Sequence, residues 1–213
     1  MKNNSRIIGM GVDLTSISRM HKLLMKYGEK FVKRIYHPIE IDQCPYSFES
    51  AFHRSNTSIG TLNMNTTNNN SPDNDDHHVS KREINTRDQE FNQHLLTQQH
   101  MVLQMKIAQY YASRWAAKEA TIKALGVSGI GSKQMYVHKQ QQTGHLLSET
   151  SKISNNYRTR LFPPLLKLEG EEISKIVREI LDERNANDYV THLSLSHEGD
   201  MAIANVIIEA IYE

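Results

Sequence analysis

The sequence predicts a single α+β domain in which helices pack on a small antiparallel or mixed sheet. Strand-like segments open the chain at about residues 7–14 and close it at 191–196 and 201–209. Helical periodicity lies between them, first at about residues 16–27 and again around Glu119. Strands and helices that are grouped in this way, rather than strictly alternating, are typical of α+β domains.

The predicted domain spans residues 6–213 and is interrupted by two polar insertions. Between about residues 49 and 92 the chain is polar, with NMNTTNNNSPDNDDHH at its centre. Such a stretch cannot bury enough apolar surface to offset the entropy of ordering, so we expect a disordered insertion. A smaller polar segment runs from about 139 to 160. The remaining residues suffice for one compact core.

Composition excludes several classes of function. The net charge of +1 argues against a nucleic-acid or anionic-membrane partner. No apolar run is long enough to span a membrane. Cys44 is the only cysteine, so neither an intramolecular disulfide nor a cysteine zinc cage is expected.

The first strand carries an acid on a bare face. Alternation places its apolar side chains on one side and Gly9, Gly11 and Asp13 on the other. Glycines in a strand often mark the close approach of a ligand or of another backbone. The alternative is an ordinary surface aspartate at the end of an edge strand.

Glu119 stands in a helical stripe that is otherwise free of charge. On a helical wheel this stripe consists of Ala108, Ala112, Trp115, Glu119, Ile122 and Gly126. A carboxylate facing an interior needs a cation, a metal or several donors. Lys123 follows one turn later, so a structural ion pair is one interpretation and a metal or phosphate site is the other.

The helix predicted at 16–27, running on to Arg34, has a basic face. Only Glu29 opposes this charge. An ordinary solvated face usually mixes signs, so we expect a docking surface for an acidic partner, with a solvated face as the alternative. The basic residues of this face are Arg19, Lys22, Lys26, Lys30 and Lys33.

The two closing strands are joined by HEGD and predict a hairpin. His197 opens the turn, directly after Ser196. A Ser/His nucleophilic pair is poorly supported, because neighbouring residues of a strand point to opposite faces.

Four segments together resemble a known family. GMGVD at 9–13, FVKRIYHPIEID at 31–42, RWAAKEATIKALG at 114–126 and HLSLSHEGDMAIANVII at 192–208 are similar to segments of holo-(acyl-carrier-protein) synthases. These are small 4'-phosphopantetheinyl transferases. The resemblance implies the 4'-phosphopantetheinyl transferase fold and transfer of 4'-phosphopantetheine from coenzyme A to a serine of apo-acyl carrier protein, with release of adenosine 3',5'-bisphosphate.

The resemblance also implies roles for individual residues. It makes Asp13 and Glu119 the ligands of Mg²⁺, and Glu119 and Lys123 the catalytic residues. Lys123, Arg114 and His197 match residues near coenzyme A. Arg19 matches a residue of the carrier-protein docking helix, and the basic face extends that surface to Lys22, Lys26 and Lys30.

The sequence leaves the general base and two rival functions open. The general base is a metal-adjacent water, Glu119, or an acid near Glu40 and Asp42, with water preferred. After the catalytic helix the chain reads GVSGIG where the family usually reads GTGIG, so this glycine loop is one residue longer than the family's. The rival functions are a non-catalytic module that binds carrier protein or nucleotide, and a Mg²⁺-dependent nucleotide phosphohydrolase.

Assembly and location are expectations from the resemblance. A homotrimer with active sites between subunits is expected. The Asn-rich insertion suggests a eukaryotic source and therefore a mitochondrial enzyme, with a cytoplasmic one as the alternative.

Overall fold

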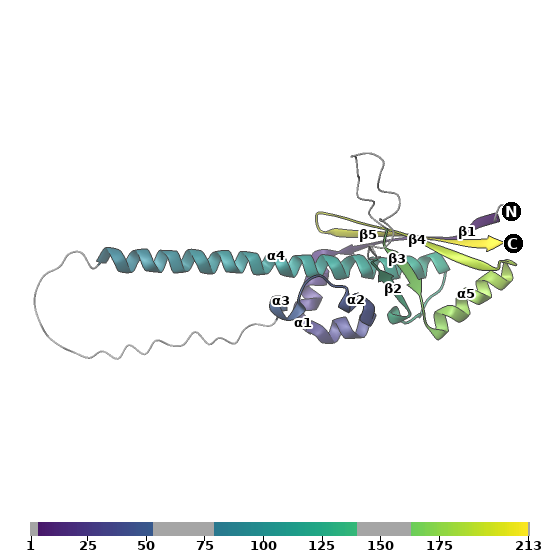
Figure 1. The fold of residues 1–213 in the computed structure, drawn as a ribbon, viewed down its shortest axis with the longest axis horizontal. Coiled ribbons are helices and arrows are strands. Elements are labelled where there is room, and N and C mark those ends of the chain that lie inside the picture. The colour runs from purple at the N-terminus through teal and green to yellow at the C-terminus, as the bar shows by residue number, and fades with distance from the viewer. Residues whose placement is uncertain (1–3, 53–78, 140–162, 213) are drawn as a thin grey trace, which may run out of the picture. The chain divides into compact units, whose positions relative to one another are not determined.

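A computed structural model describes residues 4–52, 79–139 and 163–212, and the side chains of 79–90 are not among the described groups. The elements are helices together with two small antiparallel sheets, so the predicted α+β class is confirmed. Figure 1 shows their order along the chain.

The larger sheet joins the two ends of the chain. Strand β1 (Asn4–Ser16) pairs with β5 (Met201–Tyr212), which pairs with β4 (Asp188–Glu198), giving the antiparallel order β1-β5-β4. Gly199 has a positive φ of 54° in the tight turn between β4 and β5, a conformation that glycine adopts without strain. The predicted hairpin is therefore present, with both strands longer than expected.

A second, two-stranded sheet and a helix complete this part of the core. The short helix η1 (Ser132–Gln134) leads into β2 (Met135–His138), which pairs with β3 (Leu165–Leu168). Helix α5 (Glu171–Glu183) buries Ile173, Val177 and Leu181 in the same apolar core. The 3.6-residue spacing of those three side chains explains why this segment is helical.

The carboxyl-terminal part of the long helix α4 (Val79–Leu125) packs on the larger sheet. Its contact face consists mainly of alanines, which let the helix approach the strands closely: Ala116, Ala117, Ala120 and Ala124. Although α4 is long, none of the helices in the described part of the chain is apolar enough over its length to cross a membrane.

The first helix differs from the predicted one at Gly28. Helix α1 (Ile17–Ile35) is interrupted there by a non-helical backbone, with φ 58° and ψ −146°. The interruption changes the direction of the side chains that follow it, and Tyr27, which directly precedes it, is 48% exposed. A short helix α2 (Pro38–Asp42) follows, with the His37 side chain capping its start.

The chain divides into two compact units. One comprises residues 1–46 and 105–213 and contains both sheets; the other comprises 47–104. The second unit contains α3 (Phe48–Phe52), where Phe48 and Phe52 stack, and the amino-terminal part of α4. Residues 79–92, predicted as disordered, are thus helical; their many Gln, Glu, Lys and Arg residues are good helix formers.

Residues 53–78 and 140–162 lie outside the described residues. They include most of the first predicted insertion and nearly all of the second. The disorder predicted for them stays a prediction.

Candidate functional site

Asp13 projects from β1 toward α4 and is held by two groups. The Lys123 ammonium lies 2.8 Å from its Oδ1 and also donates to the carbonyl of Val12 at 3.0 Å. The Thr15 hydroxyl donates to Oδ2 at 3.2 Å. The Asp13 side chain is 16% exposed, so the ion pair lies at the edge of the core and opens to solvent.

Gly9 and Gly11 allow this contact because they leave room for the helix backbone. A Cβ at Gly11 would lie 1.9 Å from the carbonyl oxygen of Ala120, and one at Gly9 would lie 2.1 Å from that of Ala124. Neither distance is sterically possible. Of the two interpretations of the glycine face, close approach of another backbone is the one that the structure shows.

Glu119 is not in the core, contrary to the prediction from the wheel. The buried face of α4 runs through Ala116 and Ala120, while Glu119 is half-buried beside them. Among the described residues, no hydrogen bond or ion pair satisfies its carboxylate. Its Cβ is one turn, about 6 Å, from that of Lys123 on the same side of the helix. The carboxylate is therefore free to take a cation next to Asp13 and Lys123.

His197 shares the inner face of the larger sheet with Asp13. The register places Thr15, Ala202 and His197 in one row across β1, β5 and β4. Residues that oppose one another in a sheet point to the same side. The exposed His197 imidazole thus stands at the turn end of that face, two strands from Thr15, which is hydrogen-bonded to Asp13.

The oxygen ligands that Asp13 and Glu119 offer beside Lys123 fit Mg²⁺. Asp13 and Glu119 supply two hard carboxylate oxygens, and Mg²⁺ bound with phosphates typically takes only one or two carboxylates. The Lys123 ammonium already sits against Asp13 Oδ1, where the carboxylate accepts a positive charge. No group of three or more His, Cys, Asp or Glu side chains forms a metal cage within the described ranges, so an all-protein site is not present there.

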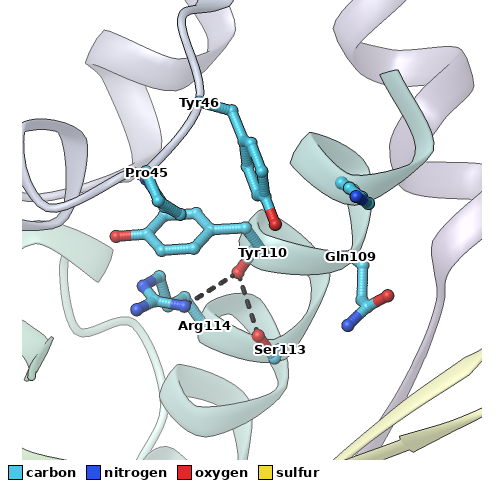
Figure 2. Close-up of a pocket in the computed structure, with 7 residues that line it drawn as sticks. Pro45, Tyr46, Gln109, Tyr110, Ser113 and Arg114 are labelled. Carbon is cyan, nitrogen blue, oxygen red and sulfur yellow. Dashed lines mark hydrogen bonds between the residues drawn. The ribbon is translucent and has the colours of Figure 1, made fainter. Parts of the chain in front are cut away.

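Arg114 lines a separate pocket of about 200 Å³ (Figure 2). Its guanidinium lies 3.3 Å from the centre of the Tyr110 ring and donates through Nη1 to the Tyr110 carbonyl at 3.1 Å. Its buried Nε has no hydrogen-bond partner among the described residues. Such a buried donor is costly to leave unsatisfied, and Lys106 adds a second cation to the pocket. The arrangement suits an anionic group such as a phosphate.

Arg114 and Lys123 lie at different places on the same helix. They are nine residues apart on α4, about 13.5 Å along its axis. The structure thus brings Asp13, Glu119 and Lys123 to one corner, with His197 on the same sheet face, and leaves Arg114 at a second position.

The predicted docking residues are all exposed, but they do not share one continuous helical face. Arg19, Lys22 and Lys26 precede the interruption at Gly28, and Lys30 follows it. A glycine between two helical runs carries no unique signature in the sequence, so the wheel could not show this change of direction.

The start of α1 is fixed by a residue that the sequence did not indicate. Asp200, in the turn between β4 and β5, accepts hydrogen bonds from the Ser16 hydroxyl at 2.7 Å and from the backbone N–H of Ser18 at 2.7 Å. The hydrogen bonds from Ser16 and then Ser18 lower the pKa of the Asp200 carboxyl. The hairpin turn therefore caps the helix that bears the basic residues.

Glu40 is removed from the candidates for a general base. Its side chain is fully buried and its Oε2 lies 2.8 Å from the Lys118 ammonium, which is also buried. The costly buried carboxylate that the sequence located at Glu119 is in fact Glu40. It escaped notice because its partner is distant in sequence.

Comparison with known proteins gives a consistent result. The chain is 26% identical over 95% of its length to a holo-[acyl-carrier-protein] synthase of Syntrophus aciditrophicus, covering 96% of that protein. It is 27% identical over 95% of its length to the holo-[acyl-carrier-protein] synthase of a Wolbachia species from Drosophila simulans, covering 98% of it. No family model matches the chain.

Solved structures of similar proteins carry the same name. The holo-ACP-synthase of Plasmodium yoelii aligns with 99% of this chain and 98% of its own, at 18% identity and a TM-score of 0.48. That of Helicobacter pylori, solved in complex with coenzyme A, aligns with 93% of this chain and 98% of its own, at 18% identity and a TM-score of 0.44. The resemblance seen in the sequence is thus confirmed along nearly the whole chain.

Proposed function

We propose that this chain, which is similar to holo-[acyl-carrier-protein] synthases over 95% of its length, is an enzyme of that class. It would transfer 4'-phosphopantetheine from coenzyme A to a serine of apo-acyl carrier protein. The observation that carries the proposal is the Asp13–Lys123 ion pair, with the Glu119 carboxylate one helical turn from Lys123 and without a partner among the described residues. Those three residues are the ones that the resemblance makes catalytic or metal-binding.

In the proposed reaction, the serine oxygen of the carrier protein attacks the β-phosphorus of the coenzyme A pyrophosphate. A bond forms between that oxygen and phosphorus, and the bond from phosphorus to the bridging oxygen breaks. Adenosine 3',5'-bisphosphate leaves with the electron pair. The Lys123 ammonium is half-exposed and flexible enough to turn from Asp13 to the leaving phosphate, whose growing negative charge it would stabilise.

Bound Mg²⁺ would neutralise the pyrophosphate and polarise the phosphorus under attack. Asp13 and Glu119 would hold it. The serine proton must pass to a base, and Glu119 or a water beside it is in a position to accept it. Glu40 cannot do so, because it is buried against Lys118.

Arg114 and His197 would bind the nucleotide part of coenzyme A. The pocket at Arg114 offers the Arg114 guanidinium and a second cation from Lys106, which suit a phosphate of the adenosine moiety. Because Arg114 lies about 13.5 Å along α4 from Lys123, one ligand within one subunit must be extended to reach both.

We also propose a homotrimer, supported by an exposed apolar face. The outer side of the larger sheet presents Met10, Leu14 and Ile203, which are 66%, 57% and 37% exposed. Leu14 and Ile203 oppose each other across β1 and β5. An apolar patch of this kind on a sheet is typical of a subunit interface. Contact with a neighbour there would cover this apolar face.

The exposed basic residues of α1 are the proposed docking surface for the carrier protein. Arg19, Lys22 and Lys26 lie on the first run of α1, which Asp200 caps. A positively charged helix favours a protein acceptor of negative charge over water. This separates the proposal from a nucleotide phosphohydrolase with a similar set of acids.

The decisive experiment is mass spectrometry of purified apo-acyl carrier protein after incubation with the enzyme, coenzyme A and Mg²⁺. We expect a gain of one phosphopantetheine, which disappears with Asp13→Ala or with a chelator. Hydrolysis of coenzyme A without modification of the carrier protein would instead reveal a phosphohydrolase. Binding without either product would reveal a non-catalytic module.

The proposed location is the mitochondrion, where such an enzyme would serve the organellar carrier protein. This part rests on the sequence resemblance and the Asn-rich insertion. Fluorescence microscopy of the carboxyl-terminally tagged chain with a mitochondrial marker tests it, and an even cytoplasmic signal would contradict it.

A further inference from the structure

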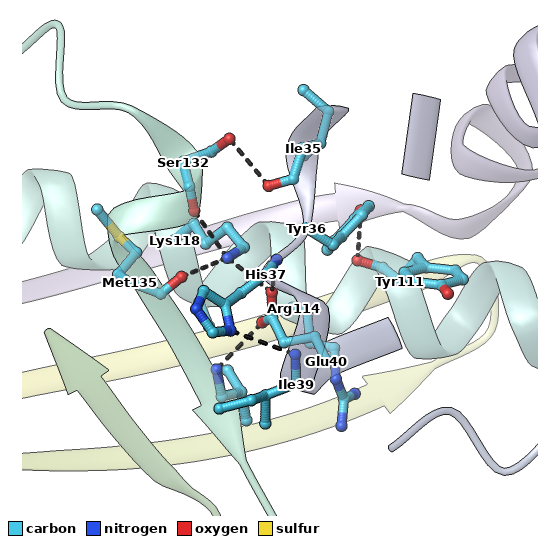
Figure 3. A network of polar contacts seen from close by, with 12 residues as sticks. Ile35, Tyr36, His37, Ile39, Glu40, Tyr111, Arg114, Lys118, Ser132 and Met135 are labelled. Carbon is cyan, nitrogen blue, oxygen red and sulfur yellow. Dashed lines mark hydrogen bonds and ion pairs between the residues drawn. The ribbon is translucent and has the colours of Figure 1, made fainter. Parts of the chain in front are cut away.

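The proposed mechanism leaves one buried pair of charges unused. Glu40 of α2 is 0% exposed, and Lys118 of α4, directly before Glu119, is 2% exposed (Figure 3). Glu40 accepts from the backbone N–H of His37 through Oε2 and from that of Val137 through Oε1, both at 3.1 Å. Both carboxylate oxygens are therefore used inside the protein, although burying two charges costs more than burying two apolar groups.

Lys118 uses its ammonium group in three directions. Besides Glu40, it donates to the carbonyl oxygen of Ser132 at 2.8 Å and to that of Met135 at 2.5 Å. An ammonium has three N–H donors, so this accounts for all of them. Burial lowers the pKa of Lys118, and the neighbouring Glu40 carboxylate opposes that shift.

Two of those contacts fix the far end of the glycine-rich loop 126–131. The near end is fixed on α4 as well, where the N–H of Gly126 donates to Lys123 O at 3.2 Å and that of Val127 donates to Ile122 O at 3.3 Å. Between the two ends, Gly129 has a φ of 84° and is exposed. The loop is thus stretched from the turn that carries Lys123 to residues clamped by Lys118.

Stability alone is a weak reason for such a pair. Two apolar side chains of the same size often stabilise a core equally well or better. Apolar side chains could not donate hydrogen bonds to backbone carbonyls, however, whereas Lys118 donates to those of Ser132 and Met135. The loop begins three residues after Lys123, beside the proposed site, and exposed backbone N–H groups of glycine-rich loops bind phosphates.

We propose that the Lys118–Glu40 pair is a positioning device that holds loop 126–131 in the shape that receives the phosphate-bearing substrate. Lys118 acts through the loop, and Glu40 holds Lys118. The proposal rests on the proposed function for the identity of the substrate, coenzyme A. The position of the loop can be measured without it.

The test uses the full-length double variant Glu40→Gln with Lys118→Met, which removes both charges at similar volume. We expect the double variant to fold with a lower melting temperature, because two carbonyls lose their donor, and to show faster hydrogen–deuterium exchange in residues 127–134. We also expect the KM for coenzyme A to rise about tenfold while kcat changes less than threefold, because the loss lies in substrate binding. The matched control is Lys175→Met with Glu179→Gln, which removes an exposed ion pair of α5 and should change none of these quantities.

Unchanged exchange in the loop, or an unchanged KM in a folded double variant, would overturn the proposal and leave the pair a structural one. Glu40→Gln alone separates the two roles further and serves if the double variant does not fold. Lys118 keeps its two carbonyl acceptors in that variant but loses the charge that holds it, so the loop should exchange faster than in the wild type and slower than in the double variant. A wild-type exchange rate would show that Glu40 does not hold Lys118. If the wild type transfers no phosphopantetheine, the proposed function fails while the exchange measurement still decides on the clamp.

Discussion

Glu119 is a half-buried carboxylate with no partner among the described side chains, beside a lysine that already has one. An acid in this position is not needed to hold the fold. Its free oxygens are available for a cation, and its distance from Lys123 places that cation next to the proposed leaving group.

We therefore expect Glu119→Gln to reduce phosphopantetheine transfer about a hundredfold or more, because the amide cannot supply the negative charge that holds Mg²⁺. The melting temperature should stay within about two degrees of the wild type, since no described contact is lost. Transfer is measured by mass spectrometry of the carrier protein and stability by calorimetry. A large loss of stability would show that Glu119 is a structural residue, which is the alternative interpretation of the sequence.

Asp200 predicts a dependence of stability on pH. Its pKa is lowered in the folded state by hydrogen bonds from Ser16 and Ser18. The pKa of an aspartate in an unfolded chain is about 3.9. Above that pH the lowered pKa of Asp200 stabilises the fold, and this stabilisation is lost as the pH falls through the pKa of Asp200 in the folded protein. Asp200→Asn should accordingly lower the melting temperature by a few degrees at neutral pH, and the difference from the wild type should shrink below about pH 4.

Thermal unfolding from pH 3 to pH 7 measures this difference. Asp182→Asn, an exposed aspartate of α5, is the control and should follow the wild type throughout. An equal difference at pH 3 and pH 7 would mean that the charge of Asp200 has no part in capping α1.

At the scale of elements, the contact between β1 and α4 depends on two missing side chains. Gly11→Ala would place a Cβ 1.9 Å from the carbonyl oxygen of Ala120, and backbone must move to relieve that overlap. We expect a loss of about 1–3 kcal/mol in the free energy of unfolding. Activity should fall further, because Asp13 moves away from Lys123 with the strand.

Denaturant unfolding and transfer assays on the same preparations test this prediction. Gly131→Ala is the stability control, because φ is −62° there and the nearest atom, in the Gln134 side chain, would be 3.5 Å away. Equal stability of the two variants would refute the close-packing explanation of the glycine face.

The basic helix supports a second prediction at this scale. Lys26→Glu with Lys30→Glu should weaken carrier-protein binding about tenfold at low salt, by reversing charge on the proposed docking surface. The effect should decrease at high salt, because exposed charges are screened. The KM for coenzyme A should not change.

Titration calorimetry with apo-carrier protein measures the affinity. Lys175→Glu on α5 is the control for a change of net charge away from α1. An unchanged affinity at low salt would place the docking surface elsewhere.

Sequence reasoning recovered those features that depend on neighbours in the chain. The hairpin and the glycine face of β1 both follow from strand alternation and turn residues. The family resemblance named Asp13 and Lys123 as site residues, but the ion pair between them was not predicted, because the sequence paired Lys123 with Glu119, its neighbour one helical turn away. The direction of the Glu119 side chain was predicted wrongly. Glu119 and Ala120 are neighbours on α4, and a rotation of the helix by one residue decides which of the two faces the core.

The features that were missed depend on residues far apart in sequence. Glu40 meets Lys118 across 78 positions, and Asp200 meets Ser18 across 182. Nothing in the local pattern of PIEID or HEGD reveals such partners. The interruption at Gly28 was missed for a different reason, since a single glycine inside a helical pattern is compatible with a continuous helix.

At the scale of the whole molecule, the outer sheet face predicts the state of assembly. Leu14→Asp with Ile203→Asp places two charges on the exposed apolar face, and we expect these charges to keep the chain monomeric, instead of the proposed trimer, with loss of transfer activity. Light scattering after size-exclusion chromatography measures the mass against the 24.5-kDa chain. Phe91→Asp, at an exposed apolar residue of α4 in the other unit, is the control. A wild-type protein that is monomeric at assay concentration would refute the trimer.

The pairing of β1 with β5 has a consequence for biosynthesis. Asn4 to Ser16 find their partners at Tyr212 to Met201, and the helix that follows β1 is capped by Asp200. A ribosome delivers the first strand and the first helix long before these partners exist. The emerging chain must therefore carry β1 without its partner until β5 has been synthesised, and the larger sheet can close only once β5 has left the exit tunnel.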